Sequence, residues 1–361
     1  MNRREFFRRA GAAASLGLLD PGRLLGQQDD ADTWRTFEIV TSVEVRQPTG
    51  PVRVWLPTPL AVAPYQKTMG DNYHAGGGHV VMIETTNENE PDTLGATWDE
   101  GVQPVLTLTS RVMTRDHSVD LASPTVPPVD IRTLGRFLRP TRLIPTDGIV
   151  KATADTITKG AYTDIDKARA IYDWIVENTF RDPKVRGCGR GDIRSMLETG
   201  NLGGKCADLN ALYVGLARAS GIPARDVYGI RTVKSEQGFK CLGPATPTIT
   251  KAQHCRAEVY LAAYGWVPVD PADVRKVALE EPPGNLTLED AVVRKARARL
   301  FGSWEMNWVA YNFGHDVSLP GAGSGPLDFL MYPQAETARG RVDSLDPDGF
   351  KYEITAREIE S

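Results

Sequence analysis

The sequence predicts an α+β fold in which an antiparallel β-domain precedes a domain of helices and strands. Apolar residues alternate with polar ones from Trp34 to about Met113, a period of two that is typical of half-buried strands. From Thr163 onward the apolar residues recur with a helical period, and strand patterns return after the second helix. Separate runs of strands and helices are typical of α+β proteins.

Length and composition limit the classes of protein to which the chain can belong. The 361 residues suggest two or three domains, and 41% hydrophobic with 24% charged residues is ordinary for a globular chain. A net charge of −4, from 42 basic and 46 acidic residues, offers no strong basic field for nucleic acid. No apolar run approaches about 18 residues, so we expect no stable membrane insertion of the mature chain.

Residues 1–26 predict an export signal. Arg3-Arg4 and a second arginine pair precede a weakly apolar stretch over 10–19, which resembles a twin-arginine signal. A disordered basic tail is the alternative interpretation. The segment carries five Arg against two acidic residues, so its removal takes the net charge from −4 to −7. We therefore expect a periplasmic or secreted protein, with a cleavage site that the sequence does not define.

The β-domain is expected over residues 33–126. Its short apolar–polar alternations are separated by turn-rich segments such as 48–51, as in an antiparallel sandwich. The residues that define the first two strands are Phe37, Ile39, Thr41, Val43 and Val45, then Val52, Val54 and Leu56.

The rest of the chain divides into three further segments. Residues 127–145 are rich in Pro and Arg and predict a linker, and residues 146–300 a second domain. Residues 301–361 predict a short C-terminal β-element that returns to pack on an earlier domain. Within the second domain a capping box precedes one apolar helix face, formed by Thr163 and Asp166 and then by Ala168, Ile171, Tyr172, Ile175 and Val176.

The Gly-rich segment 200–206 has two interpretations. Its Gly-Lys pair resembles a P-loop, but Thr199 and Cys206 replace two of the four fixed residues, which excludes nucleotide binding. The strongly helical stretch 207–220 instead places Cys206 at a helix N-terminus, after two glycines that let the backbone turn sharply. There the helix dipole and Lys205 stabilise a thiolate, whereas a buried structural cysteine is the alternative.

His254 favours the reactive interpretation of the cysteine. It lies in a strand pattern over 253–261, and a second strand pattern follows over 266–270. A hairpin centred near Ala262 would set His254 opposite Asp270, with Cβ atoms roughly 5 Å apart. A carboxylate at that distance orients an imidazole, whereas a core histidine with satisfied hydrogen bonds is the alternative.

Three motifs in this region resemble those of the transglutaminase-like superfamily: GGKCADLNALYVGLARASGIPAR, HCRAEVYL and GWVPVDP. The resemblance covers about 165–275 and implies a core related to the papain-type cysteine proteases. By position it implies that Cys206 is the nucleophile, His254 the general base and acid, and Asp270 the carboxylate that orients the histidine.

The residues around the histidine bear on substrate preference. Family members usually have a small and then an aromatic residue after it, where this chain has Cys255 and Arg256. Gln253, Arg256 and Glu258 are expected near His254, where they either contact a polar substrate or form a solvated strand face.

The resemblance implies acyl transfer through a thioester on Cys206, with His254 protonating the leaving amine. The Cys206 backbone N–H and the Asn201 side chain are candidate oxyanion donors. Resolution by water gives a peptidase or amidase, which we favour, and resolution by an amine gives a cross-linking transamidase. A non-catalytic binding module is the third alternative. We expect a peptide or protein substrate and neither a cofactor nor a metal ion.

The chain has four cysteines: Cys188, Cys206, Cys241 and Cys255. They form no CxxC motif and do not match the spacing of zinc sites. Export would place them where disulfides persist. Cys188 and Cys241 lie in loops expected to border the same cleft, so we expect a disulfide between them. The alternative is that either one pairs with Cys206 as a redox lock.

Overall fold

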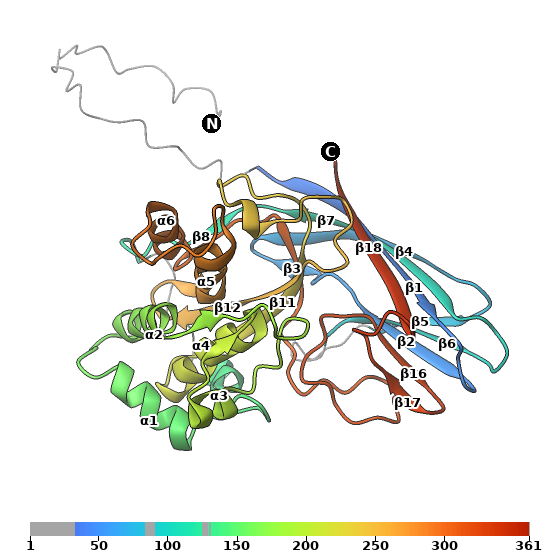
Figure 1. The fold of residues 1–361 in the computed structure, drawn as a ribbon, viewed down its shortest axis with the longest axis horizontal. Coiled ribbons are helices and arrows are strands. Elements are labelled where there is room, and N and C mark those ends of the chain that lie inside the picture. Colours follow the sequence, from blue (N-terminus) through green and yellow to red (C-terminus); the bar gives the residue numbers. More distant parts are fainter. Residues whose placement is uncertain (1–32, 84–90, 125–128, 130, 361) are drawn as a thin grey trace, which may run out of the picture. The chain divides into compact units, whose positions relative to one another are not determined.

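The computed structural model describes residues 33–83, 91–124, 129 and 131–360. These residues belong to one compact unit (Figure 1). The export signal predicted over 1–26 lies outside the described residues. No helix among the described residues combines the length and the apolar character needed to cross a membrane.

Two five-stranded antiparallel sheets form the β-rich part of the fold. The first sheet has the order β18-β1-β7-β4-β3, with β18 at Phe350–Ile359, β1 at Arg35–Val45, β7 at Val105–Thr114, β4 at Gln66–Ala75 and β3 at Val62–Ala63. The second has the order β17-β16-β2-β6-β5, with β17 at Gly340–Val342, β16 at Gln334–Thr337, β2 at Val52–Pro57, β6 at Thr93–Trp98 and β5 at His79–Ile83.

One apolar core lies between these two sheets, as the alternating pattern predicts. It is built from inward-facing residues of both sheets, and the side chains that share it include Val43, Val45, Val54, Leu56, Leu94, Leu106 and Phe350. Strand β7 buries every second residue, and such an alternation is satisfied when two sheets face each other. The predicted sandwich is confirmed.

The C-terminal residues contribute strands to both sheets. Strand β18 pairs with β1 from Thr36↔Ile359 to Val45↔Phe350, so the last and the first described strands lie side by side (Figure 1). Strands β16 and β17 extend the other sheet beyond β2. The two ends of the sequence therefore complete one sandwich.

Helices pack around a four-stranded sheet in the remaining part. This sheet has the order β13-β12-β11-β15, with β13 at Gly265–Val269, β12 at Gln253–Leu261, β11 at Ala224–Arg231 and β15 at Trp308–Asn312. Figure 1 shows the first four helices grouped beside β11 and β12. The helices are α1 Gly148–Ile157, α2 Asp164–Asn178, α3 Ile193–Thr199, α4 Cys206–Ala219, α5 Pro271–Glu280 and α6 Ala291–Arg299.

Helix α2 has the N-terminal cap and the buried face that the sequence predicts. Thr163 Oγ1 accepts from the backbone N–H of Asp166, and the Asp166 carboxylate accepts from the backbone N–H of Thr163. The predicted capping box is therefore confirmed. The buried residues of α2 are the five predicted for its apolar face. By contrast, every residue of α4 is buried, because α4 lies between the sheet and the other helices.

Short elements complete the described chain. Two-stranded pairings join β9, Phe180–Arg181, to β10, Gly203–Gly204, and β8, His117–Ser118, to β14, Ser303–Trp304. The 3₁₀ helices are η1, Ile131–Leu138, and η2, Lys240–Leu242. Within the segment predicted as a linker, η1 buries Leu134 and Phe137 against Tyr260 and Trp266.

Candidate active site

Cys206 is the first residue of α4, and Lys205 is the N-cap. Cys206 is 5% exposed and lines a cavity of about 330 Å³. The free N–H groups of a helix N-terminus carry partial positive charge, so they stabilise an anion at this position. The Cys206 backbone N–H has no hydrogen-bond partner among the described residues, which leaves it available to an oxyanion.

The Asp208 carboxylate fixes the start of α4 against the loop that carries Cys188. Asp208 Oδ1 accepts from the backbone N–H groups of Arg190 and Gly191, both at 3.0 Å. Asp208 Oδ2 accepts from the Lys205 N–H at 3.0 Å. We call these three bonds the Asp208 clasp. The clasp satisfies a buried carboxylate entirely with backbone donors.

Gly203 and Gly204, the two glycines before the nucleophile, do not form the sharp backbone turn that was predicted. Gly203 and Gly204 form β10, parallel to β9, and neither has a positive φ. A Cβ on Gly203 would lie 2.4 Å from Phe180 Cζ, and one on Gly204 would lie 2.5 Å from Asp208 Cβ. The expected sharp turn is wrong. Gly204 has no room for a Cβ because Asp208 packs directly on its backbone, whereas the Phe180 ring beside Gly203 is half-exposed and able to shift.

His254 lies on β12, and the predicted hairpin register is wrong by a small shift. Leu261 faces Gly265 in the structure, and the loop over 262–264 is centred one residue later than expected. Gly265 has a φ of 73°, which this tight loop requires. On extending this register, Asp270 lies two positions away from the residue directly opposite His254. The two side chains still share one face of the hairpin and meet.

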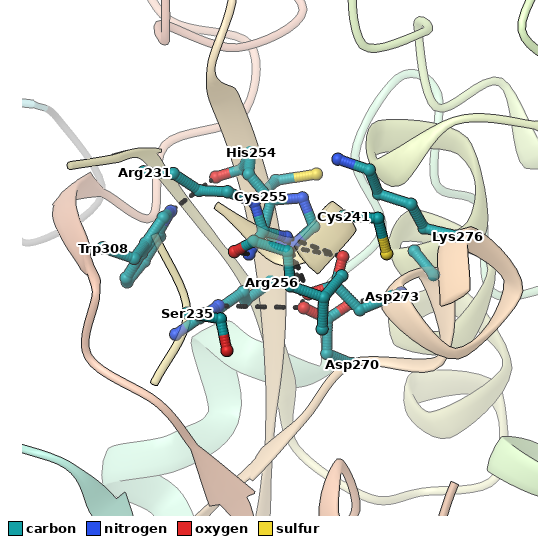
Figure 2. Close-up of polar contacts among 12 residues, drawn as sticks. Arg231, Ser235, Cys241, His254, Cys255, Arg256, Asp270, Asp273, Lys276 and Trp308 are labelled. Atoms are coloured by element: carbon teal, nitrogen blue, oxygen red, sulfur yellow. Dashed lines mark hydrogen bonds and ion pairs between the residues drawn. The ribbon is translucent and has the colours of Figure 1, made fainter. Parts of the chain in front are cut away.

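Asp270 connects the histidine to two helices (Figure 2). Its Oδ2 lies 2.7 Å from His254 Nε2. Its Oδ1 accepts from the Asp273 N–H at 3.1 Å as the N-cap of α5, and from Asn210 Nδ2 at 3.2 Å. Asn210 is one helical turn after Cys206 on α4. The histidine-orienting carboxylate and the thiol are therefore anchored to the same helix.

Two further charged residues lie at the histidine, and the sequence analysis missed both. Asp273 Oδ1 is 3.5 Å from His254 Nε2, and both Asp273 oxygens accept from Arg231 Nη2, at 2.6 and 2.7 Å (Figure 2). Asp273 is three residues after Asp270 in the first turn of α5, where it resembles an ordinary helix-terminal acid. Arg231 ends β11, and no local pattern in the sequence connects the two.

The electrostatics favour a charged thiolate–imidazolium pair. Hydrogen bonds with the thiols of Cys188 and Cys255, and then a hydrogen bond and charge from His254, lower the pKa of Cys206 well below its ordinary value despite burial. Burial and Arg231 oppose protonation of His254, but Asp273 and Asp270 raise its pKa above the ordinary value. The lowered thiol pKa and the raised histidine pKa both favour the ionised pair over the neutral pair.

The cysteines do not pair as predicted. Cys188 and Cys241 are both free thiols, so the expected disulfide between them is absent. Cys188 lies beside the nucleophile, where its carbonyl accepts from the Ala207 N–H at 2.9 Å. Cys241 lies against α5, where Glu281 Oε2 accepts from its N–H at 3.0 Å. Cys188 lines the cavity at Cys206, whereas Cys241 does not.

Arg256 lies close to the histidine site, as expected, with its Nε 3.7 Å from Asp270 Oδ2, but the solvated face expected for Arg256 and Glu258 is wrong. Arg256 is 2% and Glu258 1% exposed, so neither belongs to a solvated face, and neither lines the cavity at Cys206. Arg256 lies 4.7 Å from the Trp308 ring centroid, and Glu258 pairs with Arg225 at 2.6 Å. Aromatic residues from later in the chain cover this face. Gln253, by contrast, does line the cavity.

Asn201 does not occupy the position expected of an oxyanion donor. It is exposed, it is not among the residues that line the cavity, and its Oδ1 accepts from the Gly203 N–H at 3.2 Å. The structure gives no support to the expectation that its side chain contacts a substrate.

The cluster of His254, Asp270 and Asp273 has the composition of a metal site, with ligand atoms within 4.8 Å of one another. Its ligand atoms already have internal partners: Arg231 occupies both Asp273 oxygens, and Asp270 is bonded on each oxygen. A cation would have to displace the Arg231 charge, so the donor set fits an orienting network better than a metal centre.

The sequence of this chain is similar to those of known proteins. Residues 151–271 match the model of the transglutaminase-like superfamily, and this range contains all three candidate catalytic residues. An uncharacterized protein from Haemophilus influenzae is 35% identical over 346 residues, which cover 91% of this chain and 92% of that protein. The chain belongs to the transglutaminase-like superfamily. The predicted family is thus confirmed.

A solved structure has the same fold as this chain. It is that of a "putative cysteine protease" from Cytophaga hutchinsonii, 16% identical, with a TM-score of 0.57. The similarity covers 91% of this chain and 92% of that one, so it includes the sandwich as well as the helical part. At this identity the comparison supports the fold and not the substrate.

Proposed function

We propose that this protein is an exported cysteine-dependent acyl-transfer enzyme that hydrolyses peptide or amide bonds through a thioester on Cys206. One observation carries the proposal: a thiol of lowered pKa at a helix N-terminus shares a cavity with a histidine of raised pKa. The buried Asp270, 2.7 Å from His254, holds the ring through Nε2. This leaves Nδ1 for the thiol and for the leaving group.

Acylation uses the ion pair directly. The Cys206 thiolate attacks the carbonyl carbon, and the resulting oxyanion accepts from the free Cys206 N–H at the start of α4. The tetrahedral intermediate then collapses. The C–N bond breaks as His254 gives its proton to the leaving amine, and a thioester remains on Cys206.

Deacylation returns the site to its starting state. The now neutral His254 takes a proton from water, the hydroxide adds to the thioester carbonyl, and the C–S bond breaks. The carboxylic acid leaves and the thiolate–imidazolium pair is restored. An amine in place of this water would make a cross-linked product, which is the transamidase alternative.

Incubation with casein and a fluorescent primary amine tests the proposal. We expect new peptides with little incorporated label, and loss of at least about a thousand-fold in kcat/KM in Cys206→Ala. Cys241→Ala is the matched control, because it removes a thiol that does not line the cavity and should leave turnover unchanged.

The two alternatives predict different results in the same experiment. Amine incorporation without new peptides would replace hydrolysis by transamidation. Equal turnover in the native chain and in Cys206→Ala would exclude cysteine catalysis and leave a binding module.

A further inference from the structure

The cavity at Cys206 is surrounded by cations. Besides the nucleophile and His254, its wall includes five basic residues and no Asp or Glu. The five basic residues come from five separate segments of the chain, and they are Arg181, Lys205, Arg231, Lys251 and Lys276. In Figure 2 the Lys276 side chain extends from α5 toward β12, which carries His254.

A second cavity continues this basic wall. It has a volume of about 410 Å³ and shares Cys188, Lys205, Lys251 and Gln253 with the first. It adds no acidic residue and two basic ones, Lys351 and Arg186, of which Arg186 pairs with Asp343 at 2.7 Å. Its other lining residues are mostly apolar and include Tyr332, Leu345, Pro347, Phe350 and Tyr352. The two cavities are therefore adjoining parts of one cleft that begins at the thiol.

The basic wall is a local property and does not follow from composition. Acidic residues outnumber basic ones in the whole chain, 46 to 42. A random sample of this surface would contain carboxylates as often as ammonium and guanidinium groups. Their separation at the cleft indicates a ligand of negative charge.

The internal ion pairs leave part of this positive charge unneutralised. Arg231 is balanced by Asp273, and Arg181 and Lys276 share one carboxylate, Glu280, which lies 3.7 Å from Lys276 Nζ. No carboxylate of the described residues forms an ion pair with the two further lysines of the wall, Lys205 and Lys251. The nearby Asp208 is already satisfied by its backbone clasp.

We propose that the cleft selects acyl donors that carry a carboxylate close to the scissile bond, an inference that rests on the proposed function of Cys206. Lys276, Lys205 and Lys251 bind this carboxylate, and the apolar second cavity receives the neighbouring part of the substrate. Burial, and then Arg231, lower the pKa of Lys276, so an incoming anion would stabilise the charged form of its ammonium group.

Alkylation of the native enzyme by two nearly isosteric reagents tests the charge preference without any substrate. Iodoacetate and iodoacetamide both form a C–S bond at Cys206 and release iodide, and they differ in one negative charge. We expect the ratio of their rates to exceed that of free cysteine by roughly ten-fold or more, and to fall as salt is added. A ratio equal to that of free cysteine would overturn the proposal.

Lysine variants separate the basic wall from the charge of His254. The double variant Lys205→Gln/Lys276→Gln retains His254, and we expect it to lose most of the excess ratio. Lys151→Gln on α1 is the matched control, since its ammonium group pairs with Asp155 on an exposed helix face. If the double variant kept the native ratio, the lysines would not be the source of the preference and the proposal would fail.

Peptide pairs then locate the carboxylate. One pair differs by Glu or Gln beside the scissile bond, and the other by a free or an amidated C-terminus. We expect a higher kcat/KM for the charged member of one pair, and loss of that preference in the double variant. Cleavage with no charge preference would overturn this inference and keep the proposed function. If the native protein preferred iodoacetate but cleaved no peptide, the charge preference of the cleft would stand and the proposed hydrolysis would be overturned.

Discussion

At the residue scale, the protonation of Cys206 depends in part on His254, and that of His254 depends on two carboxylates. The thiolate is stabilised by the neighbouring thiols and by the imidazolium, while Asp273 and Asp270 stabilise the imidazolium. At low pH the thiol is protonated and unreactive. Above the raised pKa of His254 the ring loses its proton and no longer protonates the leaving amine. Turnover should therefore follow a bell-shaped pH profile.

The acid limb of this profile gives a direct test. We expect alkylation of Cys206, followed by mass spectrometry, to titrate with an apparent pKa below the free-thiol value of about 8.5. His254→Ala should raise this pKa, because the thiolate loses a hydrogen bond and a positive charge. Cys241 in the same digest is an internal reference, since burial, and then Glu281, raise its pKa. An unshifted pKa in both proteins would mean that the pair is not assembled.

The start of α4 is the element on which the site depends. The Asp208 clasp holds the loop of Cys188 against the helix, and Gly189 lies where the two meet with a φ of 93°. A Cβ there would lie 1.9 Å from Asp208 Oδ2. Because both the carboxylate and the loop are confined, neither is able to move without breaking the clasp.

Gly189→Ala should therefore destabilise the protein by more than backbone strain alone. Gly200→Ala measures that strain, because Gly200 also has a positive φ, 69°, and nothing lies within 4 Å of its Cβ position. We expect Gly200→Ala to lower the free energy of unfolding by about 1 kcal/mol, and Gly189→Ala to lower it by roughly 1–3 kcal/mol more. Urea unfolding measures both. If both variants lost the same free energy of unfolding, the loop would be able to shift away from the new Cβ and the argument from the clasp would be wrong.

The sequence predicted these elements better than their contacts. Local signals were sufficient for the α2 capping box and for the position of Cys206 at the start of α4, because both depend on neighbouring residues. The hairpin register required the loop length, which Gly265 determines through its positive φ. The burial of Arg256 was misjudged because Trp304 and Trp308, which cover it, are distant in sequence. Periodicity does not reveal such coverage.

At the scale of the whole molecule, the C-terminal residues belong to the sandwich and also reach the cleft. Phe350 is buried in the sandwich core and lines the larger cavity, together with Tyr352 from the same strand. We propose that the chain divides into a β-domain over 33–126, a linker over 127–145, a catalytic domain over 146–300 and a C-terminal β-element over 301–361. The pairing of β18 with β1 could not be predicted, because it joins residues more than three hundred positions apart.

The export proposal also concerns the whole molecule, because the twin-arginine route carries chains that have already folded. We expect Arg3→Lys/Arg4→Lys to keep the protein in the cytoplasmic fraction, since the receptor reads the arginine pair and not its charge. Fractionation of cells and immunodetection of a C-terminal tag measure the distribution.

The second arginine pair provides the matched control for this export test. Arg8→Lys/Arg9→Lys makes the same chemical change five residues later, so we expect it to leave the periplasmic amount unchanged. The charge of the leader is identical in the two variants, which separates recognition of one pair from a general basic tail. Equal periplasmic amounts in both variants would contradict twin-arginine recognition of Arg3-Arg4. The disordered basic tail would then become the better interpretation of residues 1–26.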